Sequence, residues 1–428
     1  MPGLDFNEED DSMSNEREDG KRYVIDPNDG NLEIKYGLPG EVKFCRACVL
    51  SNQRAAPSES MQDTAESQKK TVKFDDDELC DACRVVATKK EIDWEKRERE
   101  LIDLLERKRS RNGAYDCLVP GSGGKDSIYA AHMLKTKYGM NPLTVTFAPH
   151  MYTDVGWRNF QNWIHFGGFD NYLFTANGQV QRTLTRLSFT NLLHPFQPFT
   201  IGQRYFPIKL AKKMGISLIF YGENAAEYGT GGDEETQSQV PARYLTHDSD
   251  DEIFLGGVAT KQLSEHGISK QMLDPYLPMQ LSEVQQAEIE SHYLGYFLRW
   301  TPQENYYYAV EHTKFEANSE RTEGTFSKYN SIDDRVDGFH YWTGFLKFGI
   351  GRCTHEASQE VRHGHIDREE AVALVHRYDG EFPQRYFPDF LEYLGMEEDE
   401  FHSIADSFRS PHLWKRTIDG WQLRHRVS

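Results

Sequence analysis

The chain has 428 residues, of which 38% are hydrophobic and 13% aromatic, enough for a large core and for two or three domains. Its 49 Lys and Arg residues are outnumbered by 68 Asp and Glu, and the formal charge of -19 argues against general binding to nucleic acid or anionic membranes. No apolar run approaches the ~20 residues of a membrane-spanning helix, and the acidic start of the chain is not a secretory signal. We therefore expect a soluble, cytoplasmic protein.

Four segments are expected along the chain. Residues 1–40 form an acidic, partly disordered tail, because eight acids and one Arg among the first 20 residues leave little apolar surface to bury. Residues 41–112 contain two cysteine pairs and end in an amphipathic helix over 94–109, where leucines recur at helical spacing. Residues 113–275 form the central domain, and residues 276–428 a mostly helical C-terminal region.

The central domain is expected to be α/β. Short apolar runs predict strands at 116–120, 143–147, 172–175 and 218–221, and helical stretches separate them. Strands and helices in alternation predict a parallel sheet with helices on both faces. Beyond about Pro275 the strand signal fades, which predicts a largely helical C-terminal region packed on the α/β domain.

The strongest motif is a glycine-rich turn after the first strand, Pro120-Gly121-Ser122-Gly123-Gly124-Lys125-Asp126-Ser127. It is not a Walker A loop, because Asp126 follows the Lys where Ser or Thr is required, and no G-x-G-x-x-G fits through it. The remaining pattern, Ser-Gly-Gly-x-Asp-Ser, resembles the pyrophosphate loop (PP-loop) of ATP pyrophosphatases, whose fold is HUP-like. An ordinary strand-to-helix turn is the alternative.

The resemblance implies that this loop holds the β- and γ-phosphates of ATP while the α-phosphorus is attacked, which yields AMP and pyrophosphate. Exposed amides at a helix start attract phosphate, and hydroxyls can add hydrogen bonds. A cation at Lys125 and a Mg²⁺ ligand at Asp126 suit the same task. The loop residues expected to bind ATP are Ser122, Gly123, Gly124, Asp126 and Ser127.

Two further strand ends are expected to complete the site, because ligands of open α/β sheets bind outside the carboxyl ends of the strands. Phe147 ends the second strand, where the resemblance places the adenine, although a plain core residue is the alternative. Gly222 ends the fourth strand and is also expected at ATP. Glu223, Asn224 and Glu227 follow it as candidate magnesium or substrate ligands, unless they form only an exposed polar loop.

Two CxxC pairs near the start of the chain have the spacing of a metal site, Cys45 with Cys48 and Cys80 with Cys83. Four thiolates in two such pairs are typical of structural zinc. The gap between the pairs is longer than usual, but a polar segment over 55–70 accounts for the excess. An iron–sulfur cluster or reduced thiols are the alternatives.

A basic pair stands beside glycines in the C-terminal region, at Lys347 and Arg352. Related adenylating enzymes bring a Lys from outside the loop to neutralise the departing pyrophosphate, so both are candidate catalytic residues. Surface cations are the alternative. Cys353 does not head a glutaminase motif, since His355 stands where the pattern needs Gly, and Pro2 excludes an N-terminal cysteine nucleophile.

From about residue 34 to beyond 383 the chain resembles bacterial N-acetyl sugar amidotransferases of the O-antigen, pseudaminic acid and legionaminic acid pathways. The acidic tail and Cys353, where a small residue such as Ala is expected, depart from the family. The matching segments are Tyr36-Gly37-Leu38-Pro39 through Cys45, Ser51-Asn52-Gln53-Arg54, the Cys80 pair, the PP-loop, Tyr152-Thr153-Asp154 with Gly156-Trp157, Gly222-Glu223-Asn224 with Glu227-Tyr228-Gly229, His292 to Tyr296, Glu323-Gly324-Thr325, Ser331-Ile332-Asp333-Asp334, Lys347 to Arg352, and Asp379 to Pro383.

This resemblance implies an ATP-dependent amidotransferase with Mg²⁺ and structural zinc. The acetamido oxygen of an N-acetyl sugar, either nucleotide-linked or a nonulosonic acid, is adenylylated, and ammonia then gives an acetamidino sugar and AMP. Ammonia is expected from a separate glutaminase with cyclase-like subunits, similar to those of imidazole glycerol phosphate synthase. Candidate sugar or magnesium ligands are Thr153, Asp154, Glu227, Asp333 and Asp334.

Two rival functions share parts of this pattern. A tRNA-modifying, thiolating PP-loop enzyme has the same loop and often CxxC pairs, but the acidic charge and the lack of a Lys/Arg stripe argue against it. A nucleotide-binding scaffold subunit would not need both Lys125 and Asp126.

Overall fold

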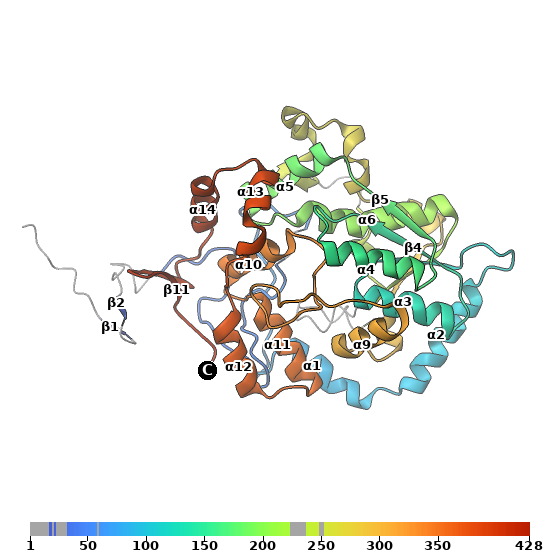
Figure 1. Ribbon diagram of the computed structural model, residues 1–428, viewed down its shortest axis with the longest axis horizontal. Coiled ribbons are helices and arrows are strands. Elements are labelled where there is room, and N and C mark those ends of the chain that lie inside the picture. The colour runs from blue at the N-terminus through green and yellow to red at the C-terminus, as the bar shows by residue number, and fades with distance from the viewer. Residues whose placement is uncertain (1–16, 19–20, 23–31, 58–59, 223–236, 248–251) are drawn as a thin grey trace, which may run out of the picture.

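The structure is a computed structural model that describes residues 17–18, 21–22, 32–57, 60–222, 237–247 and 252–428. A five-stranded sheet in the order β5-β4-β3-β6-β9 lies at its centre, and every neighbouring pair is parallel (Figure 1). The strands are β3 Cys117–Pro120, β4 Pro142–Phe147, β5 Asn171–Phe174, β6 Leu218–Tyr221 and β9 Glu290–Tyr293.

The other elements surround this sheet. Three small antiparallel hairpins lie outside it: β1 Arg17–Glu18 with β2 Lys21–Arg22, β7 Phe254–Leu255 with β8 Val258–Ala259, and β10 Trp414–Thr417 with β11 Gly420–Leu423. The α-helices are α1 Asp81–Thr88, α2 Trp94–Lys108, α3 Lys125–Thr136, α4 Asp154–His165, α5 Gly178–Leu192, α6 Gln197–Met214, α7 Leu281–Gln286, α8 Leu294–Phe297, α9 Pro302–Thr313, α10 Asp337–Phe348, α11 Arg352–His363, α12 Arg368–Tyr378, α13 Phe387–Leu394 and α14 Glu398–Ser407. Short 3-10 helices occur at Lys89–Glu91, Ala242–Tyr244, Thr260–His266, Lys270–Tyr276 and Gln384–Tyr386.

The sheet is buried on both faces. Side chains alternate along a strand, so neighbouring residues of β3 enter different apolar clusters. Cys117 and Val119 pack with Ile128 of α3 on one face, whereas Leu118 packs with Ile208 of α6 on the other. This two-sided burial explains why the central strands are continuous apolar runs and confirms the expected doubly covered parallel sheet.

The C-terminal helices pack on the central domain through aromatic rings. Phe401 of α14 stacks on Phe189 of α5, with ring centroids 4.6 Å apart and planes at 12°. Phe390 of α13 belongs to the same cluster. The predicted α/β fold with an N-terminal cysteine module and a helical C-terminal region is therefore confirmed. In the described part of the chain, no helix is both long and apolar enough to cross a membrane.

The C-terminal region is mostly helical, as expected, but it also contains three strands that the sequence did not reveal. β9 is the fifth strand of the central sheet, and β10 with β11 forms a hairpin near the C-terminus. The sequence of β9, Glu290-Ser291-His292-Tyr293, contains no apolar run, because its two central residues, Ser291 and His292, are buried polar side chains. The hairpin strands carry Lys, Arg and Gln between their apolar residues, which hides the alternation.

Candidate functional site

The glycine-rich loop connects β3 to α3, as the motif predicts. Gly123 has a φ of +86°, and a Cβ at this position would stand 2.8 Å from the Cα of Phe160 in α4. The loop therefore needs glycine both for its left-handed conformation and for its approach to α4. The Ser127 hydroxyl donates to the carbonyl oxygen of Gly124, which places Ser127 beneath the loop in the first turn of α3.

A cavity of about 400 Å³ opens beside this loop, at the carboxyl ends of β3, β4 and β6. This is the edge where open α/β sheets bind their ligands. The lining includes six residues expected at ATP, and Gly123 lies in the same loop. The lining residues are Pro120, Gly121, Ser122, Gly124, Asp126, Ser127, Val145, Phe147, Gln203, Pro207, Tyr221, Gly222 and Tyr293.

The Asp126 carboxylate is held in a fixed orientation by three donors. Its Oδ1 accepts hydrogen bonds from Trp300 Nε1 at 3.0 Å and from Asn305 Nδ2 at 2.9 Å. Its Oδ2 pairs with Lys125 Nζ at 2.6 Å. Trp300 and Asn305 are 1% and 2% exposed, so the support of Asp126 is itself packed in the core.

Phe147 and Gly222 lie where two strands end at the cavity. The Phe147 ring is 3% exposed and packs against Phe174, Phe199 and Tyr276, so it is a core residue whose edge lines the cavity. A Cβ on Gly222 would stand 2.5 Å from the carbonyl oxygen of Asp126, so no side chain fits there. Glu223, Asn224 and Glu227 lie outside the described residues.

Asp333 reaches the PP-loop from the loop between α9 and α10. Its side chain lies close enough to Ser122 for that hydroxyl to lower the pKa of its carboxyl group, and its carbonyl oxygen accepts from the backbone N–H of Thr153 at 3.0 Å. Burial raises the pKa of Asp333 above its ordinary value, while the Ser122 hydrogen bond opposes that rise. A carboxyl group from a segment more than 200 residues away in the sequence therefore lies beside the loop.

Asp334, next along the chain, is occupied by protein donors. Its oxygens accept from His150 N and Nδ1, both at 2.8 Å, from Met151 N at 3.3 Å and from Val336 N at 3.0 Å. Its side chain is 1% exposed. These contacts give Asp334 the role of holding the segment after β4 against the start of α10.

The two candidates at the start of α4 are arranged differently. Thr153 is the N-cap residue: its hydroxyl accepts from Gly156 N at 3.0 Å and donates to Ile332 O, and the residue is 5% exposed. Asp154 begins the helix and is exposed to solvent. Thr153 therefore fastens α4 to the loop that carries Asp333, whereas Asp154 is accessible to a ligand.

Lys347 and Arg352 are both interior and are absent from the described lining of the cavity. Lys347 is 2% exposed, and its Nζ donates to the carbonyl oxygen of Leu192 at 2.7 Å. Arg352 is also 2% exposed and lies 4.8 Å above the ring of Tyr341. The sequence predicted two cations beside flexible glycines that could reach departing pyrophosphate. In the structure, α10 and α11 instead pack both side chains into the protein interior.

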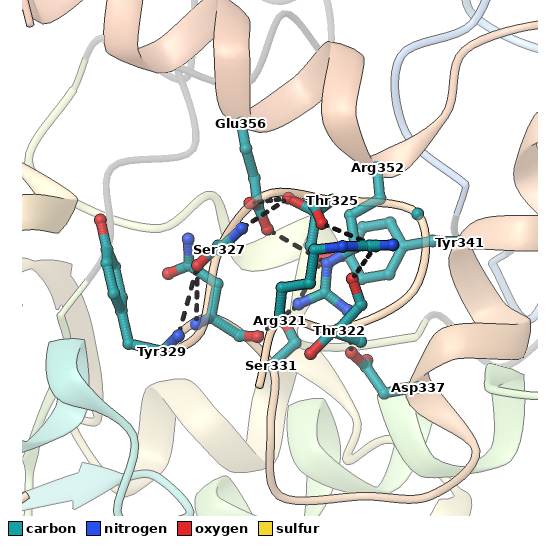
Figure 2. A network of polar contacts seen from close by, with 12 residues as sticks. Arg321, Thr322, Thr325, Ser327, Tyr329, Ser331, Asp337, Tyr341, Arg352 and Glu356 are labelled. Carbon is teal, nitrogen blue, oxygen red and sulfur yellow. Dashed lines mark hydrogen bonds and ion pairs between the residues drawn. The ribbon is translucent and has the colours of Figure 1, made fainter. Parts of the chain in front are cut away.

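Arg352 organises the loop that presents Asp333 (Figure 2). Its guanidinium contacts Glu356 Oε1 at 3.1 Å, Asp337 Oδ2 at 3.4 Å and the carbonyl oxygen of Asn330. Thr325 in turn donates to Glu356. Burial raises the pKa of Asp337 well above its ordinary value, and the Arg352 charge opposes that rise. The network ties residues 325–337 to α11 and so fixes the approach of this loop to the PP-loop.

The four cysteines meet in one cluster. The Cys45 and Cys83 sulfurs are 3.8 Å apart, those of Cys48 and Cys80 are 3.7 Å apart, and all four lie within 4.8 Å of one another. Arg362 of α11 donates to the sulfur of Cys48 at 3.8 Å. The cluster could hold a metal ion, and it joins the N-terminal module to the C-terminal helices.

Sequence reasoning missed Trp300 and Asn305. Neither lies in a motif, and both contact Asp126 across more than 170 residues. A weak signal was available: Asn305 is a polar residue on the buried side of α9, among residues with helical spacing.

One family description matches part of the chain. Residues 323–428 match the family described as LPS biosynthesis protein WbpG-like, C-terminal domain. An uncharacterised protein of Methanocaldococcus jannaschii is 34% identical over 77 residues, which are 18% of this chain and 27% of that protein. The chain thus matches about a quarter of the length of this curated relative.

Three solved structures show low similarity, and we draw no functional conclusion from them. NMN synthetase from Francisella tularensis is 14% identical, with a TM-score of 0.23 over 46% of this chain and 93% of that one. The U34-tRNA thiolase NcsA from Methanococcus maripaludis is 11% identical, with a TM-score of 0.30, and the match covers 84% of this chain and 95% of that one. NAD+ synthetase from Burkholderia pseudomallei is 13% identical, with a TM-score of 0.22, and the match covers 54% of this chain and 90% of that one.

The expected resemblance to proteins of LPS biosynthesis is supported over residues 323–428. The match begins at residue 323, so it includes the loop that carries Asp333 and the Arg352 network. Residues 323–428, about a quarter of the chain, are thus similar to the WbpG-like C-terminal domains of LPS biosynthesis proteins.

Proposed function

We propose that this chain is an ATP-dependent amidotransferase that converts the acetamido group of an N-acetyl sugar into an acetamidino group, in the biosynthesis of a surface glycan. The observation that carries the proposal is the cavity at the strand ends, which is lined by the Ser-Gly-Gly-x-Asp-Ser loop of the α/β domain. Asp333, from the segment that matches the WbpG-like description, lies beside Ser122 of that loop. The family description supplies the class of pathway, and the loop supplies the class of chemistry.

The proposed reaction has two steps. The acetamido oxygen attacks the α-phosphorus of ATP, the bond to the β-phosphate oxygen breaks, and pyrophosphate leaves. The resulting O-adenylyl imidate has AMP as its leaving group. Ammonia adds to the imidate carbon and expels AMP, which retains the former acetamido oxygen, and the product is a cationic acetamidino sugar.

The chain's own residues suit these steps. Ser122, Ser127 and the amides at the start of α3 can bind the β- and γ-phosphates, and Lys125 can neutralise them. Asp126 and Asp333 are carboxylates at this loop that can hold Mg²⁺, an ion that offsets charge on phosphate oxygens. Because Lys125 already pairs with Asp126, nucleotide binding is expected to exchange that partner for phosphate.

The proposal includes one structural metal and one separate partner. Sulfur–sulfur distances of 3.7 and 3.8 Å match the ~3.8 Å edge of a tetrahedron with 2.3 Å zinc–sulfur bonds, so we assign structural zinc to the four cysteines. Ammonia is proposed to come from a separate glutaminase with cyclase-like subunits, and the reaction is proposed to occur in the cytoplasm, where ATP is present.

The test is mass spectrometry after incubation of the protein with ATP, Mg²⁺, ammonium and N-acetyl sugars labelled with oxygen-18 in the acetamido group. The expected products are AMP carrying the label and a sugar that has exchanged one oxygen for NH. Formation of ADP would refute the proposal. AMP without an altered sugar would exclude sugar amidination and direct the same assay to tRNA.

A further inference from the structure

The end of this acidic chain is basic. The hairpin β10–β11 pairs Arg416 with Trp421 and Lys415 with Gln422. Residues 407–428 contain a single acid, Asp419, against five basic residues: Arg409, Lys415, Arg416, Arg424 and Arg426. A local surplus of four positive charges in a chain of charge -19 is an anomaly that the proposed reaction does not use.

Two of these charges face solvent. Arg416 and Arg426 are exposed, and no ion pair is found for either one within the described ranges. Arg416 lies 5.5 Å from the centroid of Trp421, so a cation and an aromatic face are presented together. In contrast, Arg409 pairs with Asp406 at 3.0 Å, which makes it part of the hairpin's own support.

The first continuous part of the chain is fastened to the base of this hairpin. Glu33 accepts through its carbonyl oxygen from His412 N at 3.3 Å, and Lys35 N donates to the Ser410 hydroxyl at 3.0 Å. Tyr36 donates its hydroxyl proton to the carbonyl oxygen of Phe408 at 2.6 Å. This continuous part, which begins at residue 32, therefore starts directly beside the basic hairpin.

The N-terminal end of the sequence carries the opposite charge. Residues 1–20 contain eight acids and one Arg. The ten-residue connection from residue 22, where β2 ends, to residue 32 spans at most ~36 Å, so the β1–β2 hairpin and the acidic segment before it start within reach of Arg416 and Arg426. Exposed ion pairs are individually weak, but a short tether supplies an effective concentration on the order of millimolar, so a weak affinity suffices.

We propose that the acidic N-terminal segment, residues 5–19, docks on the basic hairpin β10–β11 of the same chain. The occupant is the chain's own segment because its attachment point adjoins the hairpin and its charge is complementary. The acids of this segment contact Arg416 and Arg426. This interaction is independent of the reaction proposed above.

The test is zero-length carbodiimide cross-linking of the full chain at low salt, followed by peptide mass spectrometry. Lys415 is the reporter amine, since it neighbours Arg416 on β10. Cross-links from acids of residues 5–19 to Lys415 are expected, and their yield should fall about fivefold in 1 M salt. The double variant R416E/R426E retains Lys415, and its cross-link yield at low salt should also be about fivefold lower than that of the unaltered protein.

The matched control is R107E/R111E, which reverses two exposed arginines outside the hairpin and should leave the yield unchanged. Thermal unfolding of both variants checks that the fold is retained. Mixing isotopically light and heavy protein separates contacts within one chain from contacts between chains. Cross-links to lysines elsewhere, cross-links only between chains, or none at low salt would each overturn the proposal.

Discussion

The support of Asp126 by Asn305 is the contact whose removal tests the site most directly. Asn305 Nδ2 donates to Asp126 Oδ1 at 2.9 Å, and Asn305 is 2% exposed. In Asn305→Ala this donor is lost, while Trp300 Nε1 at 3.0 Å and Lys125 Nζ at 2.6 Å remain. The carboxylate keeps partners but loses part of its fixed orientation.

The expected magnitude follows from these distances. A hydrogen bond to a charged group contributes roughly 1.5–3 kcal/mol, and the two remaining donors favour the lower end. About 1.5 kcal/mol corresponds to roughly tenfold in an equilibrium constant. If Asp126 orients Mg²⁺ on the nucleotide, the Kd for ATP in the presence of Mg²⁺ should rise by about this factor in Asn305→Ala.

Isothermal titration of ATP, with Mg²⁺ and then with EDTA, measures this effect. The tenfold loss should appear only with Mg²⁺, because without the metal the carboxylate has no ion to orient. Val310→Ala is the matched control, since Val310 is on the same helix and 40% exposed. Equal affinities for Asn305→Ala and the unaltered protein, with melting temperatures also equal, would refute a positioning role for Asn305.

Three further perturbations have defined outcomes. A Cβ on Gly222 would stand 2.5 Å from the Asp126 carbonyl oxygen, so Gly222→Ala should weaken ATP binding at least about tenfold, as measured by titration. Unchanged affinity would contradict ATP binding in this cavity. The clustered thiols, Cys80 among them, should react with a thiol reagent only after a chelator is added, and metal analysis should find about one zinc per chain. Burial raises the pKa of Asp379 to about 6, so the folded state binds this proton more tightly than the unfolded state. The stability from this group is therefore complete below pH 4 and is lost as the pH rises through 6, by about 3 kcal/mol in total. Denaturant unfolding at several pH values should show this loss in the unaltered protein and not in Asp379→Asn. If the free energy of unfolding depends on pH in the same way in both proteins, Asp379 is not the cause.

The sequence was sufficient to predict those elements whose pattern of residue types lies within a few neighbouring residues. The four apolar runs became β3 to β6, and the Ser-Gly-Gly-x-Asp-Ser turn lies between β3 and α3, because strand burial and loop conformation depend on neighbouring residues. The cysteine pairs also met as expected, since each CxxC places two thiols on one turn. Strand β9 was missed because its buried central residues, Ser291 and His292, are polar and leave no apolar run to detect.

The sequence by itself determined the glycine-rich loop, the parallel sheet and the four-cysteine cluster, since each depends on residue types at short, fixed spacing. Tertiary structure alone decided which distant groups reach that loop: Asp333 contacts Ser122, and Asn305 contacts Asp126. It also decided that Lys347 is interior, with its ammonium on a carbonyl oxygen at the end of α5. The physical reason is that such contacts follow from how helices pack on the sheet, and packing joins positions more than 150 residues apart, where local periodicity carries no information.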